Sequence, residues 1–177
     1  MTDWTRPSEF VPVGSAWVPL VGERWLSDKG KGLGYRQVEK EDSVIVLPVQ
    51  ADHVLGGAPT FRPGVGRATL DFPSGGLPQA RTPEDIVPFL LARELAITAN
   101  AITSIDALNS KKLNINSSLS RQGLWAFVAE IEESFPSPEG LIGAKAKTDS
   151  GGLAHLKENS DRLQCRSVLL EWQQHGS

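Results

Sequence analysis

Three apolar segments of the chain predict a shared core. Residues Ser43–Val49 form a short run rich in β-branched side chains, which is typical of a buried strand. Leu124–Ile131 has the same character and predicts a second buried strand. From Pro83 to Ala99, apolar positions cover most of the circumference of a helix, so this helix is expected to be largely buried. Two apolar strands and one apolar helix must bury their faces together, which favours an α/β architecture.

Weaker patterns predict the remaining elements. Glu23–Leu26 and Tyr35–Val38 read as short strands joined by a turn at Lys29–Gly32. A further strand is expected after Ala101, and a terminal helix over Leu163–Gln173.

Two other segments carry no strong periodic signal. Met1–Val21 shows no clean period, and Phe135–Gly152 is rich in Pro, Gly, Ser and Lys and predicts a long loop. We therefore expect no regular element in Phe135–Gly152.

The central helix has a recognisable start. Thr82 is a plausible N-cap, Pro83 suits the first helical position, and Glu84 and Asp85 favour the positive end of the helix dipole. Pro88 lies inside the pattern and predicts a kink, or two short helices that meet there. Capping explains both acids adequately.

Immediately before this helix, the chain changes from strand to a glycine loop. Leu70 and Phe72 share one face of an alternating segment, and Pro73–Gly76 then interrupts the regular structure. Adjacent glycines let the backbone approach a ligand or another backbone closely. Strand, glycine loop and helix together are a layout that can present a loop carbonyl and a helix to a phosphate-bound metal.

Composition narrows the classes of function. The 177 residues are 40% hydrophobic and 22% charged, which is ordinary for one globular domain. A net charge of −3 without a Lys/Arg cluster argues against nucleic acid as a partner, and no apolar run approaches the roughly 20 residues of a membrane span. Cys165 stands alone, which excludes an internal disulfide and a cysteine metal cluster. With no signal-peptide pattern at the N-terminus, we expect a cytoplasmic protein.

Several motifs resemble those of the Nudix hydrolases, and most closely their ADP-ribose pyrophosphatase branch. The resemblance lies in the run TFRPGVGR at Thr60–Arg67, the run GRATLDFPSGG that ends at Gly76, and Arg93-Glu94-Leu95. The family box reads G-x5-E-x7-R-E-U-x-E-E-x-G-U, where U is aliphatic. Here the spacing from Gly76 to Arg93 is three residues longer, and Ile97 and Thr98 stand where the box has two acids. The box is therefore degenerate.

The resemblance implies a fold and an assembly. It implies a Nudix-type α/β/α sandwich with a mixed β-sheet over residues 41–177, and a small N-terminal antiparallel sheet over residues 1–40 that mediates a homodimer. Trp4, Trp17 and Trp25 make this first segment dense in tryptophan, and such side chains need burial. Packing of these side chains on the same chain is the alternative.

The resemblance also implies site residues. Glu94 is the expected catalytic residue and Mg²⁺ ligand, the backbone carbonyl of Ser74 is the second metal ligand, and Thr98 takes the place of an acid one helical turn after Glu94. A threonine hydroxyl is a neutral, far weaker ligand than the carboxylates that magnesium prefers. Mg²⁺ binding is therefore expected to be weak or absent.

The phosphate side of the site is implied in the same way. Arg62 and Arg67 are expected to bind diphosphate, because guanidinium forks suit phosphate oxygens, and Gly75 and Gly76 are expected beside the substrate. Arg62 and Arg67 serving as surface or ion-pair residues is the alternative, as is a purely structural role for Arg93 and Glu94.

Two functions follow. The first is a Nudix-fold module that binds a nucleoside diphosphate derivative such as ADP-ribose or a nucleotide sugar, with catalysis impaired. The second is an active metal-dependent hydrolase that cleaves such diphosphates.

Overall fold

The computed structural model describes the backbone of residues 5–15, 18–136 and 140–175. The chain divides into two units: Met1–Asp42 with Asn114–Gly123, and Ser43–Leu113 with Leu124–Ser177. In the described part of the chain, no helix is long and apolar enough to cross a membrane.

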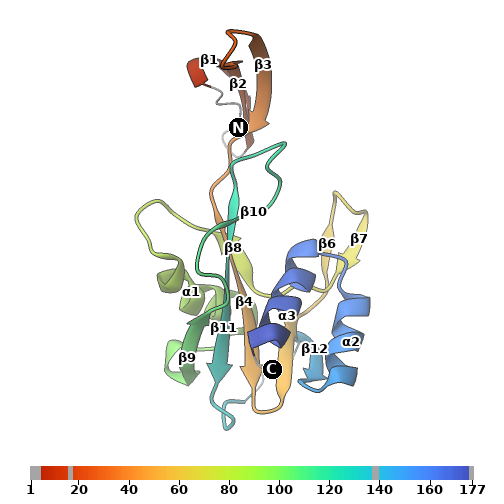
Figure 1. Ribbon diagram of the computed structural model, residues 1–177. Coiled ribbons are helices and arrows are strands. Elements are labelled where there is room, and N and C mark those ends of the chain that lie inside the picture. The colour runs from red at the N-terminus through yellow and green to blue at the C-terminus, as the bar shows by residue number, and fades with distance from the viewer. Residues whose placement is uncertain (1–4, 16–17, 137–139, 176–177) are drawn as a thin grey trace. The chain divides into compact units, whose positions relative to one another are not determined.

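The first unit is a three-stranded antiparallel sheet. Its strands β1 (Thr5–Ser15), β2 (Val18–Leu26) and β3 (Gly32–Val38) pair in the order β1-β2-β3 (Figure 1). The predicted N-terminal sheet and its turn are confirmed, but β1 forms where the sequence showed no period. Its alternation is broken by two register shifts in the pairing with β2, which explains the missing signal.

The segment Asn114–Gly123 belongs to this unit and ties to its strands. The amide of Val38 donates to the carbonyl of Leu119 at 2.8 Å, and the Tyr35 hydroxyl donates to the carbonyl of Ser118. Glu23 is fully buried, forms an ion pair with Arg121, and accepts a 3.0 Å hydrogen bond from the Trp25 indole. Trp25 is half-buried in this way, whereas Trp4 and Trp17 lie outside the described residues.

The second unit is built on a mixed sheet. Two long strands, β4 (Ser43–Gln50) and β11 (Gly123–Ile131), run parallel at its centre, as the two apolar runs predicted. The full order is β10-β11-β4-β5-β12, with β8 beside β4 and β9 beside β11. The outer strands are β5 (His53–Gly57), β8 (Ser74–Gly76), β9 (Ile102–Ala107), β10 (Leu113–Asn114) and β12 (Ile142–Lys147).

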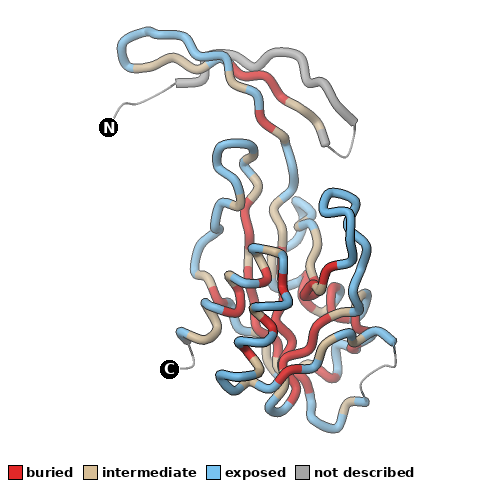
Figure 2. The backbone as a smooth tube through the Cα atoms, turned by 90° about the vertical axis from the view of Figure 1, so that its right-hand side faces the viewer, coloured by how far each residue is buried: buried red, intermediate tan, exposed pale blue. Residues whose placement is uncertain are grey.

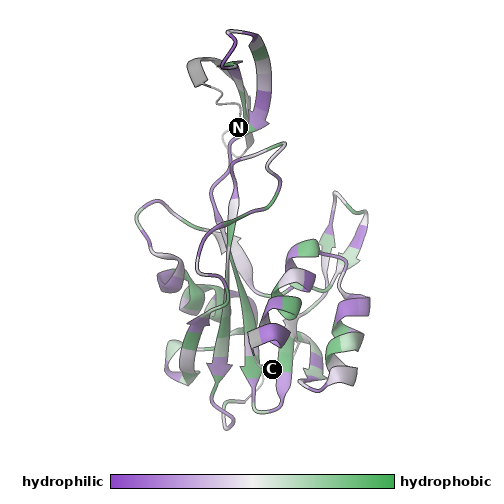
Figure 3. Ribbon diagram, in the orientation of Figure 1, coloured by the Kyte–Doolittle hydropathy of each residue, from purple (hydrophilic) through white to green (hydrophobic). Residues whose placement is uncertain are grey.

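Helices cover the sheet on both faces (Figures 1 and 2). Helix α1 (Pro83–Leu95) packs on β4 and β9, and its buried residues join Val44, Val46 and Phe127 in the core. Alternation along β4 points the buried Ile45 and Leu47 to the opposite face, where α3 (Leu163–His175) packs. Helix α2 (Ser150–Asn159) packs on β12. Figure 3 shows the central strands as the most hydrophobic part of this unit, and the predicted α/β sandwich with a mixed sheet is confirmed.

Three sequence predictions about these elements are wrong. Helix α1 is continuous through Pro88 and not two short helices, and it ends at Leu95 instead of Ala99, because Ala96 adopts a left-handed conformation with φ 52°. The segment Ser74–Gly76, expected to be irregular, is strand β8 paired with Ser43–Ile45. The expected loop Phe135–Gly152 contains β12 and the start of α2, where only two α2 side chains, Leu153 and Leu156, are buried and the helical pattern is correspondingly weak. A 3₁₀ turn, Ala99–Ala101, follows α1.

Candidate functional site

The residues of the candidate site come from four places in the second unit. The hairpin of β6 (Thr60–Arg62) and β7 (Arg67–Thr69) carries two arginines, and the segment from Asp71 to β8 carries Ser74 and the glycines. The last turn of α1 supplies Arg93 and Glu94, and the link between α2 and α3 supplies Asp161 and Arg162.

The two predicted metal ligands, Glu94 and Ser74, are bridged by Arg93. Nη2 of Arg93 donates to the carbonyl oxygen of Ser74 at 2.8 Å and forms an ion pair with Oε1 of Glu94. The guanidinium also lies over the Phe89 ring, 5.6 Å from its centroid. The structure thus brings Glu94 and Ser74 together, with an internal cation between them.

The residues present do not fit a magnesium site in this arrangement. Magnesium takes oxygen ligands, typically one or two carboxylates besides waters and phosphates. Here a single carboxylate and a single carbonyl face the same point, and both already bind a guanidinium. In the described part of the chain, no group of three or more His, Cys, Asp and Glu side chains is placed to hold a metal ion.

Ile97 and Thr98, which stand where the family box has two acids, lie beyond the end of α1. Because α1 ends at Leu95, Thr98 is not on the helical face of Glu94 and instead caps the following 3₁₀ turn with its backbone. The expectation of an i, i+4 pair at Glu94 and Thr98 is therefore wrong. Ile97 is 1% exposed and belongs to the hydrophobic core.

Gly75 has a packing role at this site. A Cβ atom at Gly75 would lie 2.8 Å from Cδ2 of Leu90 and 3.4 Å from Nη2 of Arg93. Only glycine lets strand β8 approach the last two turns of α1 this closely. Gly76 follows in the same strand and pairs with Ser43. Contact of either glycine with a substrate stays a prediction.

Arg62 and Arg67 face each other across the β6–β7 hairpin as register partners. Arg62 forms an ion pair with Asp71, with Nε donating to Oδ2 at 2.8 Å. Arg67 forms an ion pair with Asp161, and both arginine side chains stay substantially exposed. The ion-pair alternative and the phosphate-binding prediction are compatible here, because each guanidinium has five donors and uses only part of them.

Three residues at this site, Asp71, Asp161 and Arg162, were missed in the sequence. Asp71 is 8% exposed and holds Arg62, with Nη1 of Arg162 at 3.2 Å from the same oxygen. Arg162 also lies near Ser74, where its Nη1 donates to the hydroxyl at 3.4 Å. The only signal for Arg162 was its place in a short polar link before a helical pattern, and such links are common.

The start of α1 forms the predicted cap. The amide of Asp85 donates to the Thr82 hydroxyl at 3.3 Å, and the amide of Thr82 donates to the Asp85 carboxylate at 3.1 Å. That backbone hydrogen bond holds the pKa of Asp85 below its ordinary value. Asp85 therefore caps the helix, as predicted.

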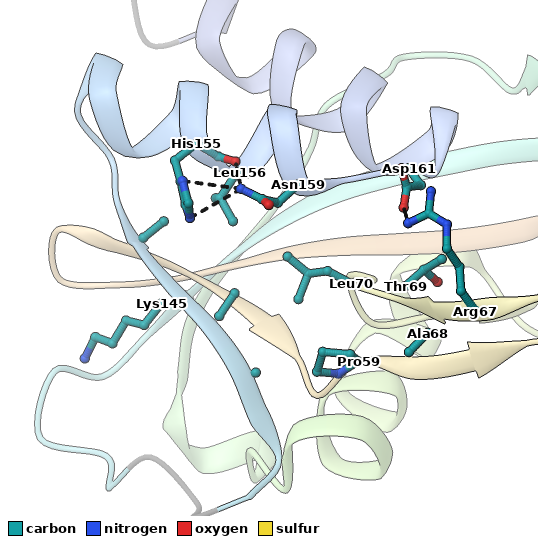
Figure 4. A pocket seen from close by; sticks show the side chains of 13 residues that line it. Pro59, Arg67, Ala68, Thr69, Leu70, Lys145, His155, Leu156, Asn159 and Asp161 are labelled. Carbon is teal, nitrogen blue, oxygen red and sulfur yellow. Dashed lines mark hydrogen bonds and ion pairs between the residues drawn. The ribbon is translucent and has the colours of Figure 1, made fainter.

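A pocket of about 510 Å³ opens beside Arg67, between the β7 segment, β12 and α2 (Figure 4). The Arg67–Asp161 ion pair lies at one side of it, and His155 and Asn159 of α2 lie at another. The rest of the lining is mostly apolar, with Thr69, Gly143 and Lys145 besides Pro59, Ala68, Leu70, Ala144, Ala146 and Leu156. The pocket is therefore mixed in character, and Arg67, Asp161 and Lys145 are its charged lining residues.

Cys165 is 1% exposed on α3. Burial raises the pKa of its thiol, so it is a packing residue.

No protein-family model matches the chain, and no curated protein does. Solved structures do match. One, described as the crystal structure of an ADP compounds hydrolase, superposes with a TM-score of 0.74 over 97% of this chain and 92% of that chain, at 14% sequence identity. The predicted Nudix-type fold class is therefore confirmed, and this chain has the fold of an ADP compounds hydrolase.

Proposed function

We propose that this protein binds a nucleoside diphosphate derivative, of the ADP-ribose or nucleotide-sugar class, and that its metal-dependent hydrolysis is impaired. The observation that carries the proposal is the position of Arg93, which binds both Glu94 and the Ser74 carbonyl.

A magnesium ion and the Arg93 guanidinium would compete for the same two oxygens. They are also both cations and repel each other, although this repulsion is screened because Arg93 is 46% exposed. With only one carboxylate at this point, little favours the metal over the arginine. Glu94 and Ser74 are thus the residues that would hold Mg²⁺, and weak or absent binding is the expected result.

The opposite side of the site favours an anion. Arg62, Arg67 and Arg162 share two carboxylates, Asp71 and Asp161, so the cluster keeps one positive charge in excess. Arginine forks bind phosphate oxygens in pairs, and the ion pairs hold these guanidiniums in place before a ligand arrives. The pocket beside Arg67 lies in the size range of small-molecule sites and can receive the nucleoside or sugar.

The second candidate is an active hydrolase. Two observations favour it: Glu94 remains at the end of α1, and a solved structure with the same fold is described as an ADP compounds hydrolase. In this case Arg93 must swing away from Ser74 when metal and substrate bind.

One experiment separates the two candidates. We expect ADP-ribose to raise the melting temperature of the wild-type protein in EDTA, and to be hydrolysed slowly or not at all when Mg²⁺ is added. Hydrolysis that Glu94→Gln abolishes, and that Glu84→Gln on the same helix leaves intact, would establish the active hydrolase instead. If ADP-ribose and nucleotide sugars show neither binding nor turnover, both candidates are overturned.

For assembly, we propose a homodimer formed through the N-terminal unit. Trp25 is only half-buried there, and tryptophan is a common anchor of interfaces. Light scattering should show a dimer at micromolar concentration, and Trp25→Ser should shift it toward monomer. A wild-type monomer at high micromolar concentration would contradict the proposal.

A further inference from the structure

Arg162 extends from the link between α2 and α3 to the centre of the candidate site. Its Nη1 lies 3.2 Å from Oδ2 of Asp71 and 3.4 Å from Oγ of Ser74. Its side chain is 28% exposed, compared with 8% for Asp71. The link therefore delivers a third arginine to the place where the hairpin delivers Arg62.

Asp71 is the carboxylate that binds both Arg62 and Arg162. It is 8% exposed, its Oδ2 interacts with both Arg62 and Arg162, and its Oδ1 accepts a 3.3 Å hydrogen bond from the Thr69 hydroxyl. A single buried carboxylate that orients two arginines neutralises only one of them. The second positive charge is available to a ligand.

We propose that Arg162 is a phosphate-binding residue, which forms a diphosphate clamp with Arg62 and Arg67. This rests on the proposed nucleotide-binding function and assigns to that site a residue from the C-terminal helices. The neighbouring Asp161 binds Arg67, so one link positions two guanidiniums. Nη1 of Arg162 serves Asp71 and Ser74, and the remaining donors of the fork are left for the phosphate oxygens.

A purely structural role makes a different prediction. If Arg162 only neutralises Asp71, its removal becomes harmless once Asp71 is neutral. A phosphate ligand, in contrast, loses the same donors whether or not Asp71 carries a charge. Comparing the effect of Arg162→Gln in the wild type and in Asp71→Asn separates the two roles.

The experiment measures the affinity of the full chain for inorganic pyrophosphate and ADP-ribose in EDTA by calorimetry. Arg162→Gln should weaken binding of both about tenfold or more in both backgrounds, because a charge-assisted hydrogen bond is lost. The affinity of Arg162→Lys should lie between those of the wild type and Arg162→Gln, since lysine keeps the charge but not the fork. The matched control is Arg166→Gln, an exposed arginine one turn along the chain, with no ion pair among the described residues, and it should leave the affinity unchanged.

The outcomes are distinct. If the wild type binds the probes and Arg162→Gln behaves like Arg166→Gln, the clamp is overturned while nucleotide binding stands. If Arg162→Gln weakens binding in the wild type but not in Asp71→Asn, the clamp is overturned in favour of the structural role. If the wild type binds neither probe, the clamp and the proposed function both fall.

Discussion

The two sides of the candidate site differ in their charge. At the end of α1, one carboxylate remains, and an arginine binds the oxygens that a metal would need. At the β6–β7 hairpin and the α2–α3 link, three arginines are gathered on two carboxylates. One side thus holds a single carboxylate paired with an arginine, and the other holds three guanidiniums on two carboxylates.

Under the function proposed above, this difference would separate recognition from chemistry within one fold. A diphosphate carries enough negative charge to bind arginines without a metal, whereas hydrolysis needs the metal to activate water and to neutralise the phosphates. Under the function proposed above, a site with one carboxylate would therefore bind a diphosphate and cleave it slowly or not at all. The predictions below test this asymmetry, beginning with the largest effect.

Ile97→Glu should destabilise the protein by several kcal/mol. Ile97 is 1% exposed in the hydrophobic core, and a buried carboxylate without a partner is costly. Thermal and urea denaturation measure the effect. Thr98→Glu, at an exposed position next along the chain, is the control and should change the stability little. If Ile97→Glu were as stable as the wild type, a second acid could be restored here by simple substitution.

Gly75→Ala should lower the stability by about 1–3 kcal/mol, because the added methyl group overpacks Leu90 and presses on Arg93. Gly64→Ala is the matched control, since a Cβ atom there meets no neighbour within 4 Å. Denaturant titration compares them. Equal stabilities of the two variants would show that β8 can move away from α1, against the close packing described above.

Ala68→Trp should weaken ADP-ribose binding about tenfold and leave pyrophosphate binding unchanged. Ala68 is exposed and lines the pocket beside Arg67, so an indole would fill the space proposed for the nucleoside or sugar. Calorimetry with both ligands distinguishes the two parts. An equal loss for pyrophosphate would place the obstruction at the arginines.

Arg93→Gln should raise Mg²⁺ affinity several-fold, because it frees Glu94 and the Ser74 carbonyl from a competing cation. Calorimetric titration with MgCl₂ measures it. The double variant Arg93→Gln with Glu94→Gln is the control and should lose the gain. An unchanged affinity in Arg93→Gln would show that the guanidinium does not block the metal.

Asp85→Asn should lower the melting temperature slightly near pH 7. The pKa of Asp85 is lowered by the backbone hydrogen bond from Thr82, so its carboxylate stabilises the fold above the unfolded value of about 3.8 and loses this effect as pH falls through the folded pKa. Melting curves from pH 7 to pH 2 should therefore converge with the wild type. Glu84→Gln in the same turn is the comparison. A constant difference at all pH values would exclude the carboxylate charge as the cause.

Much of the fold follows from local pattern. The β4 and β11 strands are long apolar runs, and the start of α1 carries a complete cap, so both are visible in the sequence. Helix α2 buries only Leu153 and Leu156, and β12 only Ala146, so both segments read as polar. Their positions are set by packing on the sheet and not by their own periodicity.

The site was predictable only in part. Arg62, Arg67, Ser74 and Glu94 stand in motifs and were named, and the structure brings Ser74 and Glu94 together. Arg162 is 91 residues from Asp71 along the chain, and no local pattern reveals that ion pair. The end of α1 was also misplaced, because a left-handed alanine is a poor sequence signal compared with glycine.

The rate at which Cys165 is chemically modified can report how often α3 opens. Cys165 is the chain's single thiol, it is 1% exposed, and its pKa is raised by burial, so a thiol reagent reaches it only when α3 separates from the sheet. The rate of its modification therefore counts these openings in an unaltered protein. A ligand held by Arg162, just before α3, would tie that helix down and slow the reaction.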